Sequence, residues 1–439
     1  MSRIVTLAVG VMAACLLIYP QVGISQYHFI RCPQNPVMSA NPFGGWDAVH
    51  VLEPSVLFRD GHYHMWYTGW DGSGQHSIGY ARSTDGIFWC RYRDNPVLPG
   101  NVFPWTLGGI RNSSVSWLDS QYVMLFQMYP GGSGPQRRVG LAVSRNETSW
   151  HTYPDPVLMT GESGLWDSDG IGYCSSIIYW RGRYWTWFAG WGPFGYRIGA
   201  ATSNDLIHWV KYSDNPVLIQ GNVGEWDANT VCHPEVYIRG NKLEMWYAGW
   251  PSSSLSNSGF GLAFSEDGVH WVKSLDNPVF EIGAPGQWDD RFVGAPTVVY
   301  EEHSVKLWYS AYGYSAPWSG QWNVGLAEAN LALNSAQEEQ IENTTSTTSG
   351  LEVFGPNPFT STVEFEVLSP GGGDSRVSIF NVLGQKVREL AIDGFPGKPA
   401  RIVWDGKDCI GQTVGNGMYF ILMRSEGHTH VQKVLKIDH

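Results

Sequence analysis

The sequence has few charged residues, few cysteines and no run of basic residues. Only 15% of its 439 residues are charged, and the formal net charge is −12. An acidic chain without a Lys/Arg cluster does not have the charge distribution of a nucleic-acid-binding protein. The six cysteines are not spaced as metal ligands, and five of them, an odd number, follow the N-terminal segment. The sequence therefore predicts neither a zinc site nor a disulfide framework.

Long apolar runs are absent after residue 20, which argues against a later transmembrane helix. The N-terminal segment itself has one positive residue, Arg3, before the apolar stretch 4–19. We expect residues 1–25 to be a signal peptide that is cleaved after Ser25, and the protein to be secreted or displayed at the cell surface. The alternative is a lipoprotein site at Cys15, although the apolar residues 16–18 that follow it are unfavourable for such a site.

Tryptophan and glycine, by contrast, are abundant. The chain has 22 Trp and 52 Gly, which is typical of short strands joined by tight turns rather than of a coiled coil or a disordered chain. Residues 351–439 hold only one Trp, with nine Lys/Arg against ten Asp/Glu, a net charge of −1. This contrast predicts a second, different domain at 351–439. We interpret the polar, aperiodic segment 331–350 as a linker.

A repeat of about sixty residues runs through residues 26–330. Each unit contains an Asn/Asp-Pro-Val tripeptide, a Trp about ten residues later, an apolar strand, an aromatic strand, a Gly-x-Ala strand and a closing strand. Four short strands repeated five times predict an all-β fold, a five-bladed β-propeller. The fifth unit lacks its closing strand, so we expect the segment around Phe29 to supply it. The repeated prolines are Pro36, Pro96, Pro156, Pro216 and Pro278.

Carboxylates are rare where the inner strands of such a propeller face its centre. Only Glu53 and Glu235 bring one there, and a buried carboxylate must be solvated, paired or functional. A structural salt bridge from Glu53 to Arg111 or Arg291 is the alternative to a catalytic role. His233 is a hydrogen-bond partner, a sugar ligand or a ligand of a central structural metal ion. The inner-strand starts align as Glu53, Asn112, Cys174, His233 and Ala295.

An aromatic residue follows each strand start by seventeen positions, on the same rim as the site. Flat aromatic faces stack on sugar rings, so these residues are candidate sugar platforms, with packing between blades as the alternative. They are Trp70, Tyr129, Trp191, Trp250 and Tyr312.

The aspartates of the repeated Trp-Asp pairs lie on the site side as well. Their repetition argues for capping of the loop rather than catalysis, because catalysis needs one acid and one base. Asp47 and Asp227 remain candidates for tuning the site. The aspartates of the Ser-x-Asp turns, at 85, 205 and 267, are expected to be turn formers.

Residues 27–330 resemble the five-bladed glycosidases of the arabinanase/xylosidase and β-fructosidase clans, and more loosely the β-mannoside phosphorylases. The resemblance rests on residues 203–209 (SNDLIHW) followed by 215–218 (NPVL), and on 53–56 (EPSV) before 60–63 (DGHY). It implies three carboxylates around the centre. Glu53 stands where the base is expected, but Ser114 and Tyr173 occupy the other two positions, and Glu235 of the fourth unit offers a carboxylate instead.

Residues 351–439 resemble the C-terminal sorting domain of the type IX secretion system, which has an Ig-like β-sandwich fold. The matching segments are 356–359 (PNPF), 381–387 (NVLGQKV), 404–406 (WDG), 417–419 (GMY) and 433–437 (KVLKI). The resemblance implies an outer-membrane secretion machinery as partner. The alternative is an Ig-like spacer. We expect a chain truncated after Asn330 to keep its fold.

Of three hypotheses, these features favour a secreted glycoside hydrolase that is monomeric and needs no cofactor. Glu235 would be the general acid and Glu53 the base or nucleophile, with Asp47 or Asp227 tuning the pair. A non-catalytic carbohydrate-binding propeller and a surface scaffold are the alternatives. The expected substrate-binding residues are His233, Asn112, Arg111, Arg291, Trp70, Trp191 and Trp250.

Overall fold

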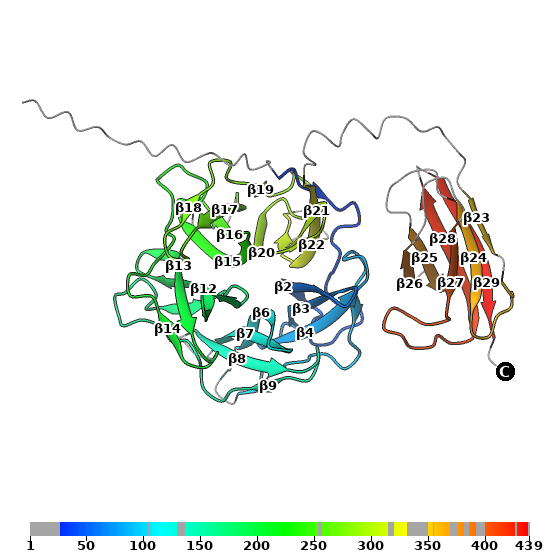
Figure 1. The fold of residues 1–439 in the computed structure, drawn as a ribbon, viewed down its shortest axis with the longest axis horizontal. Helices are drawn as coiled ribbons and strands as arrows, with labels where there is room; N and C mark the ends of the chain where they lie inside the picture. The colour runs from blue at the N-terminus through cyan, green and yellow to red at the C-terminus, as the bar shows by residue number, and fades with distance from the viewer. Residues whose placement is uncertain are drawn as a thin grey trace, which may run out of the picture.

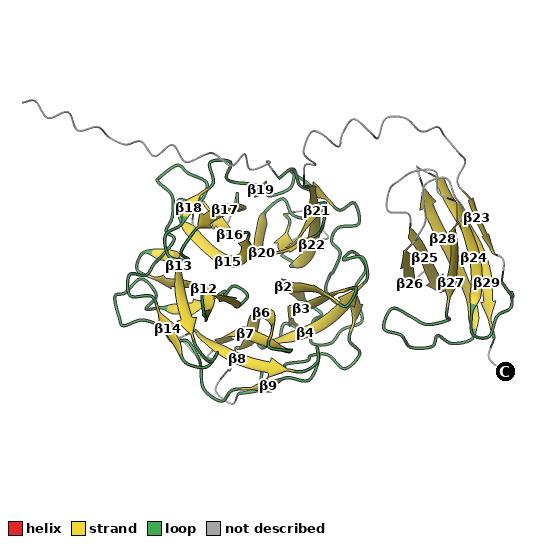
Figure 2. Ribbon diagram, viewed as in Figure 1, coloured by secondary structure: helices red, strands yellow, loops and turns green. Residues whose placement is uncertain are grey.

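The computed structural model describes residues 27–103, 106, 108–129, 137–252, 257–314, 320–331, 350–353, 355–368, 376–381, 386–391, 400–425 and 428–437. The signal peptide predicted for 1–25 lies outside these residues, as does nearly all of the linker predicted for 331–350. Within the described ranges every regular element is a β-strand (Figures 1 and 2). None of these ranges contains a helix that could cross a membrane.

The strands of residues 30–330 follow the repeat and lie around a common centre (Figure 1). Each unit is a set of antiparallel strands, and one parallel pair, His76 with Gly109, joins the first two sets. Unit one contains β2 (His50–Arg59), β3 (His62–Trp70), β4 (His76–Ser83) and β5 (Cys90–Arg91). Unit two contains β6 (Gly109–Leu118), β7 (Gln121–Tyr129), β8 (Arg138–Ser144) and β9 (His151–Thr152).

Units three and four each contain a fifth short strand. Unit three contains β10 (Gly170–Gly172), β11 (Ile178–Trp180), β12 (Arg183–Gly192), β13 (Gly195–Ser203) and β14 (Trp209–Lys211). Unit four contains β15 (Thr230–Arg239), β16 (Lys242–Trp250), β17 (Gly259–Ser265), β18 (Val272–Lys273) and β19 (Phe280–Glu281).

Unit five is closed by the N-terminal strand, as the sequence predicts. It contains β20 (Phe292–Tyr300), β21 (Ser304–Tyr312) and β22 (Asn323–Asn330). The strand β1 (Ile30–Arg31) pairs with β22 and completes the set. The two ends of the repeat region are thus hydrogen-bonded to each other, which covers edges that would otherwise be exposed.

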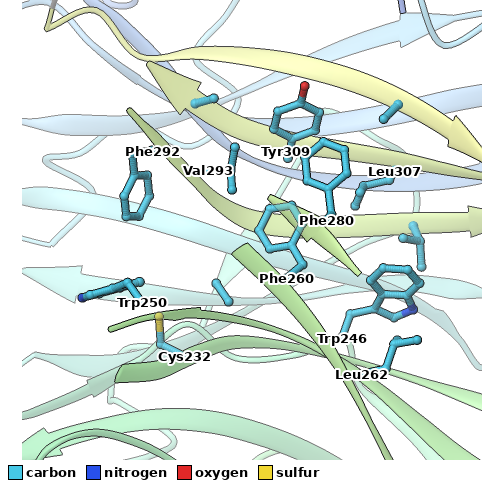
Figure 3. Close-up of a cluster of buried hydrophobic side chains, with 14 of the residues drawn as sticks. Cys232, Trp246, Trp250, Phe260, Leu262, Phe280, Phe292, Val293, Leu307 and Tyr309 are labelled. Carbon is cyan, nitrogen blue, oxygen red and sulfur yellow. The ribbon is translucent and has the colours of Figure 1, made fainter. Parts of the chain in front are cut away.

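Aromatic side chains fill the spaces between the strands. Figure 3 shows one such cluster, built from units four and five, in which Phe280 lies between Phe260 and Tyr309. The ring centroid of Phe280 is 5.5 Å from that of Phe260 and 4.9 Å from that of Tyr309. Aromatic packing of this kind explains why so few charged residues are needed.

In units one, three, four and five a loop Trp closely contacts a Gly of the strands that follow it. Trp46 lies directly over Gly69 of β3 and Gly79 of β4, and a Cβ atom added to Gly79 would lie 2.5 Å from the ring. The same arrangement recurs for Trp166 and Trp226, and Trp288 lies over one such glycine, Gly325. The Gly-x-Ala motif is therefore a packing requirement of the Trp in the preceding loop.

We expect Gly79→Ala to destabilise the protein by about 1–3 kcal/mol, because the new methyl group forces Trp46 out of a filled space. Gly415→Ala is the matched control, since a Cβ atom there meets nothing within 4 Å. The free energy of unfolding from urea titrations compares them. Equal stability of the two variants would contradict the packing argument.

Residues 350–437 form a separate body with two antiparallel sheets. One contains β23 (Gly350–Val353), β24 (Val363–Leu368) and β27 (Ala400–Trp404). The other contains β26 (Lys386–Ala391), β25 (Arg376–Asn381), β28 (Gly417–Ser425) and β29 (His428–Lys436). A hydrophobic cluster of its own, including Phe365, Ile379, Trp404 and Ile421, fills this body.

Cys90 of β5 and Cys409 form a disulfide that joins the two bodies. The prediction that the cysteines form no disulfide framework is therefore wrong for this pair. Spacing could not reveal it, because 319 residues separate the two cysteines. Among the described cysteines, Cys32, Cys174 and Cys232 are free, so the last two do not pair with each other.

Candidate active site

Five equivalent residues point into one space at the centre of the repeat units. Each has a positive φ, between 47° and 55°; four are the fourth residue of their inner strand, and Tyr173 directly follows β10. In units one, two, four and five the strand register shifts at this position, as expected for a β-bulge. All five residues line the same small space: Glu53, Asn112, Tyr173, His233 and Ala295.

The third unit differs from the expected alignment by one residue. Tyr173, not Cys174, has the left-handed conformation. Ile177 is four positions after Tyr173, whereas Val56 is three positions after Glu53. The additional residue interrupts the inner strand, so that β10 and β11 replace one continuous strand.

A larger cavity of about 200 Å³ adjoins this space. Glu53, Tyr173, His233 and Ala295 line both, so the two form one continuous site. Four of the eight other residues that line the cavity are aromatic. The eight are Leu52, Arg111, Tyr196, Trp250, Phe292, Gly294, Ser310 and Trp322.

Glu53 is buried and fully paired. The Arg111 guanidinium donates hydrogen bonds to both carboxylate oxygens, with Nε 2.9 Å from Oε1 and 3.1 Å from Oε2. Oε2 also accepts from the Thr68 hydroxyl at 2.9 Å and from the Asn112 amide at 3.0 Å. Burial alone would raise the pKa of Glu53, but Arg111 and Thr68 outweigh it and hold the pKa below its usual value. Glu53 is therefore an anion at neutral pH.

Glu235 has the opposite environment. It is buried on the same small space, and among the described residues its carboxyl group is hydrogen-bonded to Ser176, whose amide lies 3.4 and 3.3 Å from the two carboxyl oxygens. Burial raises the pKa of Glu235 to about 7, and the hydrogen bonds from Ser176 act in the opposite direction. Glu235 therefore carries a proton over much of the neutral range. One site thus holds an ionised and a protonated carboxyl group, the combination that acid/base catalysis requires.

His233 lies in the wall between the two spaces as a neutral side chain. Burial lowers the pKa of His233 to about 4, and its ring centroid is 4.1 Å from that of Tyr173. Nδ1 is 3.0 Å from the Cys232 sulfur. Because burial raises the pKa of Cys232 as well, the thiol is protonated and can donate to Nδ1, which leaves the ring proton on Nε2. His233 is then a hydrogen-bond donor.

The predicted sugar platforms divide into two groups. Trp250 lines the cavity, 5.4 Å from Phe292 between ring centroids. Trp70 instead stacks with His50 and His76, and Trp191 packs under the Arg137 guanidinium at 4.2 Å. Packing, the alternative considered for this set, therefore describes Trp70 and Trp191.

Arg291 does not reach Glu53, and Arg111 alone makes that ion pair. The Arg291 guanidinium lies over the rings of Tyr312 and Tyr314, at 5.4 and 4.4 Å. Neither described lining includes it. The expectation that Arg291 binds substrate is thus not supported by its position.

Asp47 and Asp227 form structural ion pairs away from the site. The Arg91 Nε atom lies 3.1 Å from Asp47, and the Lys273 Nζ atom 2.6 Å from Asp227. The equivalent Asp167 and Asp289 pair with Lys211 and Arg31. Neither Asp47 nor Asp227 is among the described residues that line the cavity. These ion pairs anchor the outermost strand of each of these units, and the tuning role of Asp47 and Asp227 stays a prediction.

We expect Lys273→Met to destabilise the protein by roughly 1–3 kcal/mol, because buried Asp227 loses its partner while the lysine is itself partly exposed. The kcat/KM of the folded protein should not change. Urea unfolding and steady-state kinetics on a cleaved glycan measure the two effects. A fall in kcat/KM at unchanged stability would restore a site role for Asp227.

Four aromatic lining residues were not among the predicted site residues: Tyr173, Tyr196, Phe292 and Trp322. Phe292 pairs with Tyr312 at the position where the other units have His50, Gly109, Gly170 and Thr230. A large aromatic residue in place of small ones was the available signal. In the described part of the chain, no group of three or more His, Cys, Asp or Glu side chains is placed to hold a metal ion.

Comparison with solved structures places the repeat region among glycoside hydrolase structures. A putative glycoside hydrolase from Parabacteroides distasonis matches with a TM-score of 0.55 at 20% identity, over 70% of this chain and 98% of its own. The chain has the fold of these proteins. A putative glycoside hydrolase from Bacteroides ovatus matches with a TM-score of 0.55 at 22% identity, over 69% of this chain and 96% of its own.

A third structure comes from the GH130 family of mannoside phosphorylases, which contains hydrolases of β-1,2-mannosidic linkages in Candida mannan. It matches with a TM-score of 0.56 at 22% identity, over 72% of this chain and 99% of its own. No protein-family model and no curated protein matches the sequence. At these identities the likeness establishes the fold, and the activity must be argued from the site.

Proposed function

We propose that the five units are the blades of a five-bladed β-propeller and that the protein is a glycoside hydrolase acting at the centre of that propeller. The observation that carries the proposal is the division of protonation states between Glu53 and Glu235 within one site. A single environment would give both carboxyl groups similar pKa values. Here Arg111 stabilises one anion, and burial without a cation keeps the other neutral.

The proposed reaction begins with the proton on Glu235. Glu235 donates it to the glycosidic oxygen as the bond to the anomeric carbon breaks. Glu53 either attacks the anomeric carbon or accepts a proton from the attacking water, while its negative charge stabilises the oxocarbenium-like transition state. The glycosidic bond is broken, water supplies a hydroxyl to one fragment and a proton to the other, and Glu235 is reprotonated.

The remaining lining is suited to binding a sugar. Trp250, Phe292 and Trp322 provide apolar surface for a pyranose or furanose face, and His233 Nε2 provides a hydrogen-bond donor. The substrate class we propose is therefore a polysaccharide or oligosaccharide.

A non-catalytic carbohydrate-binding propeller is the second candidate. The bidentate contact of Arg111 with Glu53 favours it, because this contact occupies the carboxylate that a reaction would use. The second candidate is also favoured by Ser114 and Tyr173, which stand where the resemblance implies carboxylates.

The deciding experiment measures reducing-sugar release from a panel of plant and microbial polysaccharides, with a glycan array in parallel. Release that disappears in both Glu53→Gln and Glu235→Gln supports the hydrolase. Binding on the array with no release from any polysaccharide supports the second candidate. If the protein neither binds nor cleaves any glycan, the surface scaffold is the hypothesis that remains.

For the C-terminal domain we propose an Ig-like sandwich that directs secretion through an outer-membrane machinery. The two antiparallel sheets with their own core are consistent with such a domain. We also propose that the protein is exported, so its substrate is extracellular. Deletion of residues 351–439 should leave the protein inside the producing cell. Unchanged appearance of this deletion variant outside the cell would contradict the sorting role.

A further inference from the structure

The C-terminal domain contacts the first unit through a compact set of residues. Besides the Cys90–Cys409 disulfide, the Arg82 Nη2 atom donates to the Cys409 carbonyl at 2.9 Å. The Lys386 ammonium lies 5.0 Å from the centroid of the Phe88 ring. All the contacts on the first unit come from the end of β4, the turn after it and β5.

A carboxyl pair adds to the same contact. Asp85 and Glu389 are hydrogen-bonded to each other across it. Burial and the neighbouring Asp85 raise the pKa of Glu389 to about 7, against the effect of Lys386 at 2.9 Å, while the pKa of Asp85 is lowered to about 2. The Ser378 hydroxyl donates a further hydrogen bond to Glu389. The carboxyl groups of Asp85 and Glu389 and the Arg82 Nη2 atom therefore have partners at this contact, as in a specific interface.

The position of this contact leaves the cavity open. β4 begins at His76, which stacks with Trp70 on the cavity side, and ends at Ser83. Eight strand residues span roughly 25 Å. In Figure 1 the C-terminal strands lie to one side of the repeat units, next to β4.

We propose that this contact is a covalent clasp, which keeps the C-terminal domain attached to the first unit even after the chain is cut within residues 332–349. The inference does not depend on the proposed hydrolase activity. A cut in the linker alone would then yield two chains that stay together. Separation of the domains would need reduction of Cys90–Cys409 as well.

The chemistry of the clasp is a thiol–disulfide exchange. The Cys90 and Cys409 thiols lose two protons and two electrons as their S–S bond forms. A disulfide-bonded oxidoreductase accepts the electrons through a mixed disulfide and is released as a dithiol. Such oxidants act in exported compartments, so the clasp closes where an exported protein folds.

The test uses the full-length chain with a specific protease site inserted between residues 332 and 349. After complete cutting, a denaturing gel without reductant should show one band at the mass of the whole protein. The same sample treated with dithiothreitol should show two. Two bands without reductant would overturn the proposal.

Cys90→Ser should give two bands without reductant, and Cys32→Ser, which removes a free cysteine, should still give one. If Cys90→Ser does not fold, the unmodified protein remains decisive. Mass spectrometry of its unreduced tryptic digest should contain a cross-linked peptide pair that holds Cys90 and Cys409. The presence of both cysteines only as free thiols would refute the clasp.

Discussion

A variant with Gln in place of Glu235 should hydrolyse its glycan about 10²–10⁴-fold more slowly than the unmodified protein, because an amide cannot donate the proton that the leaving group needs. The fold should survive, since Gln has the same shape and removes no ion pair. Initial rates of reducing-sugar release measure the effect.

The pH profile gives an independent check. Since the pKa of Glu235 is about 7, kcat/KM should fall tenfold for each pH unit above about 7 as the acid ionises. Glu53, with its lowered pKa, sets the acidic limb at a pH below the usual range of a Glu. A profile that stays flat up to pH 9 would exclude Glu235 as the acid.

Glu244→Gln is the matched control. Glu244 is also buried in unit four with a pKa raised by burial, but it bonds Trp246 and Tyr300 and does not line the cavity among the described residues. Its replacement should leave kcat/KM unchanged. Equal losses in both variants would mean that the effect is structural.

Arg111→Met should destabilise the protein by about 3–5 kcal/mol at pH 7, because it leaves the Glu53 carboxylate buried without a cation. The pKa of Glu53 lies below its ordinary value of 4.5, so the pair stabilises the fold above that pH, and the contribution is lost as the pH falls through the folded-state pKa. The loss of stability in the variant should therefore be largest at pH 7 and should shrink as the pH falls below 4.5. Its acidic limb should move to higher pH.

Urea unfolding at several pH values measures both effects. Arg93→Met is the control, since its ion pair with Asp94 is exposed and should be worth less than about 1 kcal/mol. The double variant Glu53→Gln/Arg111→Met should be more stable than Arg111→Met, because no unpaired charge remains. If Arg111→Met is as stable as Arg93→Met, a stabilising ion pair between Glu53 and Arg111 is ruled out.

Much of the fold follows from local rules in the sequence. The Asn/Asp-Pro-Val period and the Trp–Gly spacing predict the units, because each is a packing requirement within sixty residues. The role of the Trp-Asp aspartates was predictable too. In four units a cation lies two positions after the aromatic residue of the closing segment, as Arg31, Arg91, Lys211 and Lys273. Unit two lacks both members of this ion pair and has Thr106 in place of the aspartate and Thr152 in place of the cation.

The parts that could not be predicted depend on contacts between distant residues or on single insertions. Cys90 and Cys409 lie in different domains, so neither spacing nor number pairs them. The extra residue after Tyr173 shifts one inner strand by one position, which no period of sixty reveals. Which of Arg111 and Arg291 pairs with Glu53 could be decided only from the three-dimensional structure, because the sequence offers an arginine near two of the inner strands.

The ring of left-handed residues has a consequence for how this site can change. Glu53, Asn112, Tyr173, His233 and Ala295 have the same backbone conformation although their side chains share no chemistry. A non-glycine residue in this conformation costs about 1–3 kcal/mol, and the surrounding strands maintain it whichever residue is present. The backbone therefore provides five equivalent side-chain positions around one space. A new acid, base or ligand introduced at Ala295 would face the same space as Glu53 and His233 without any rebuilding of the fold.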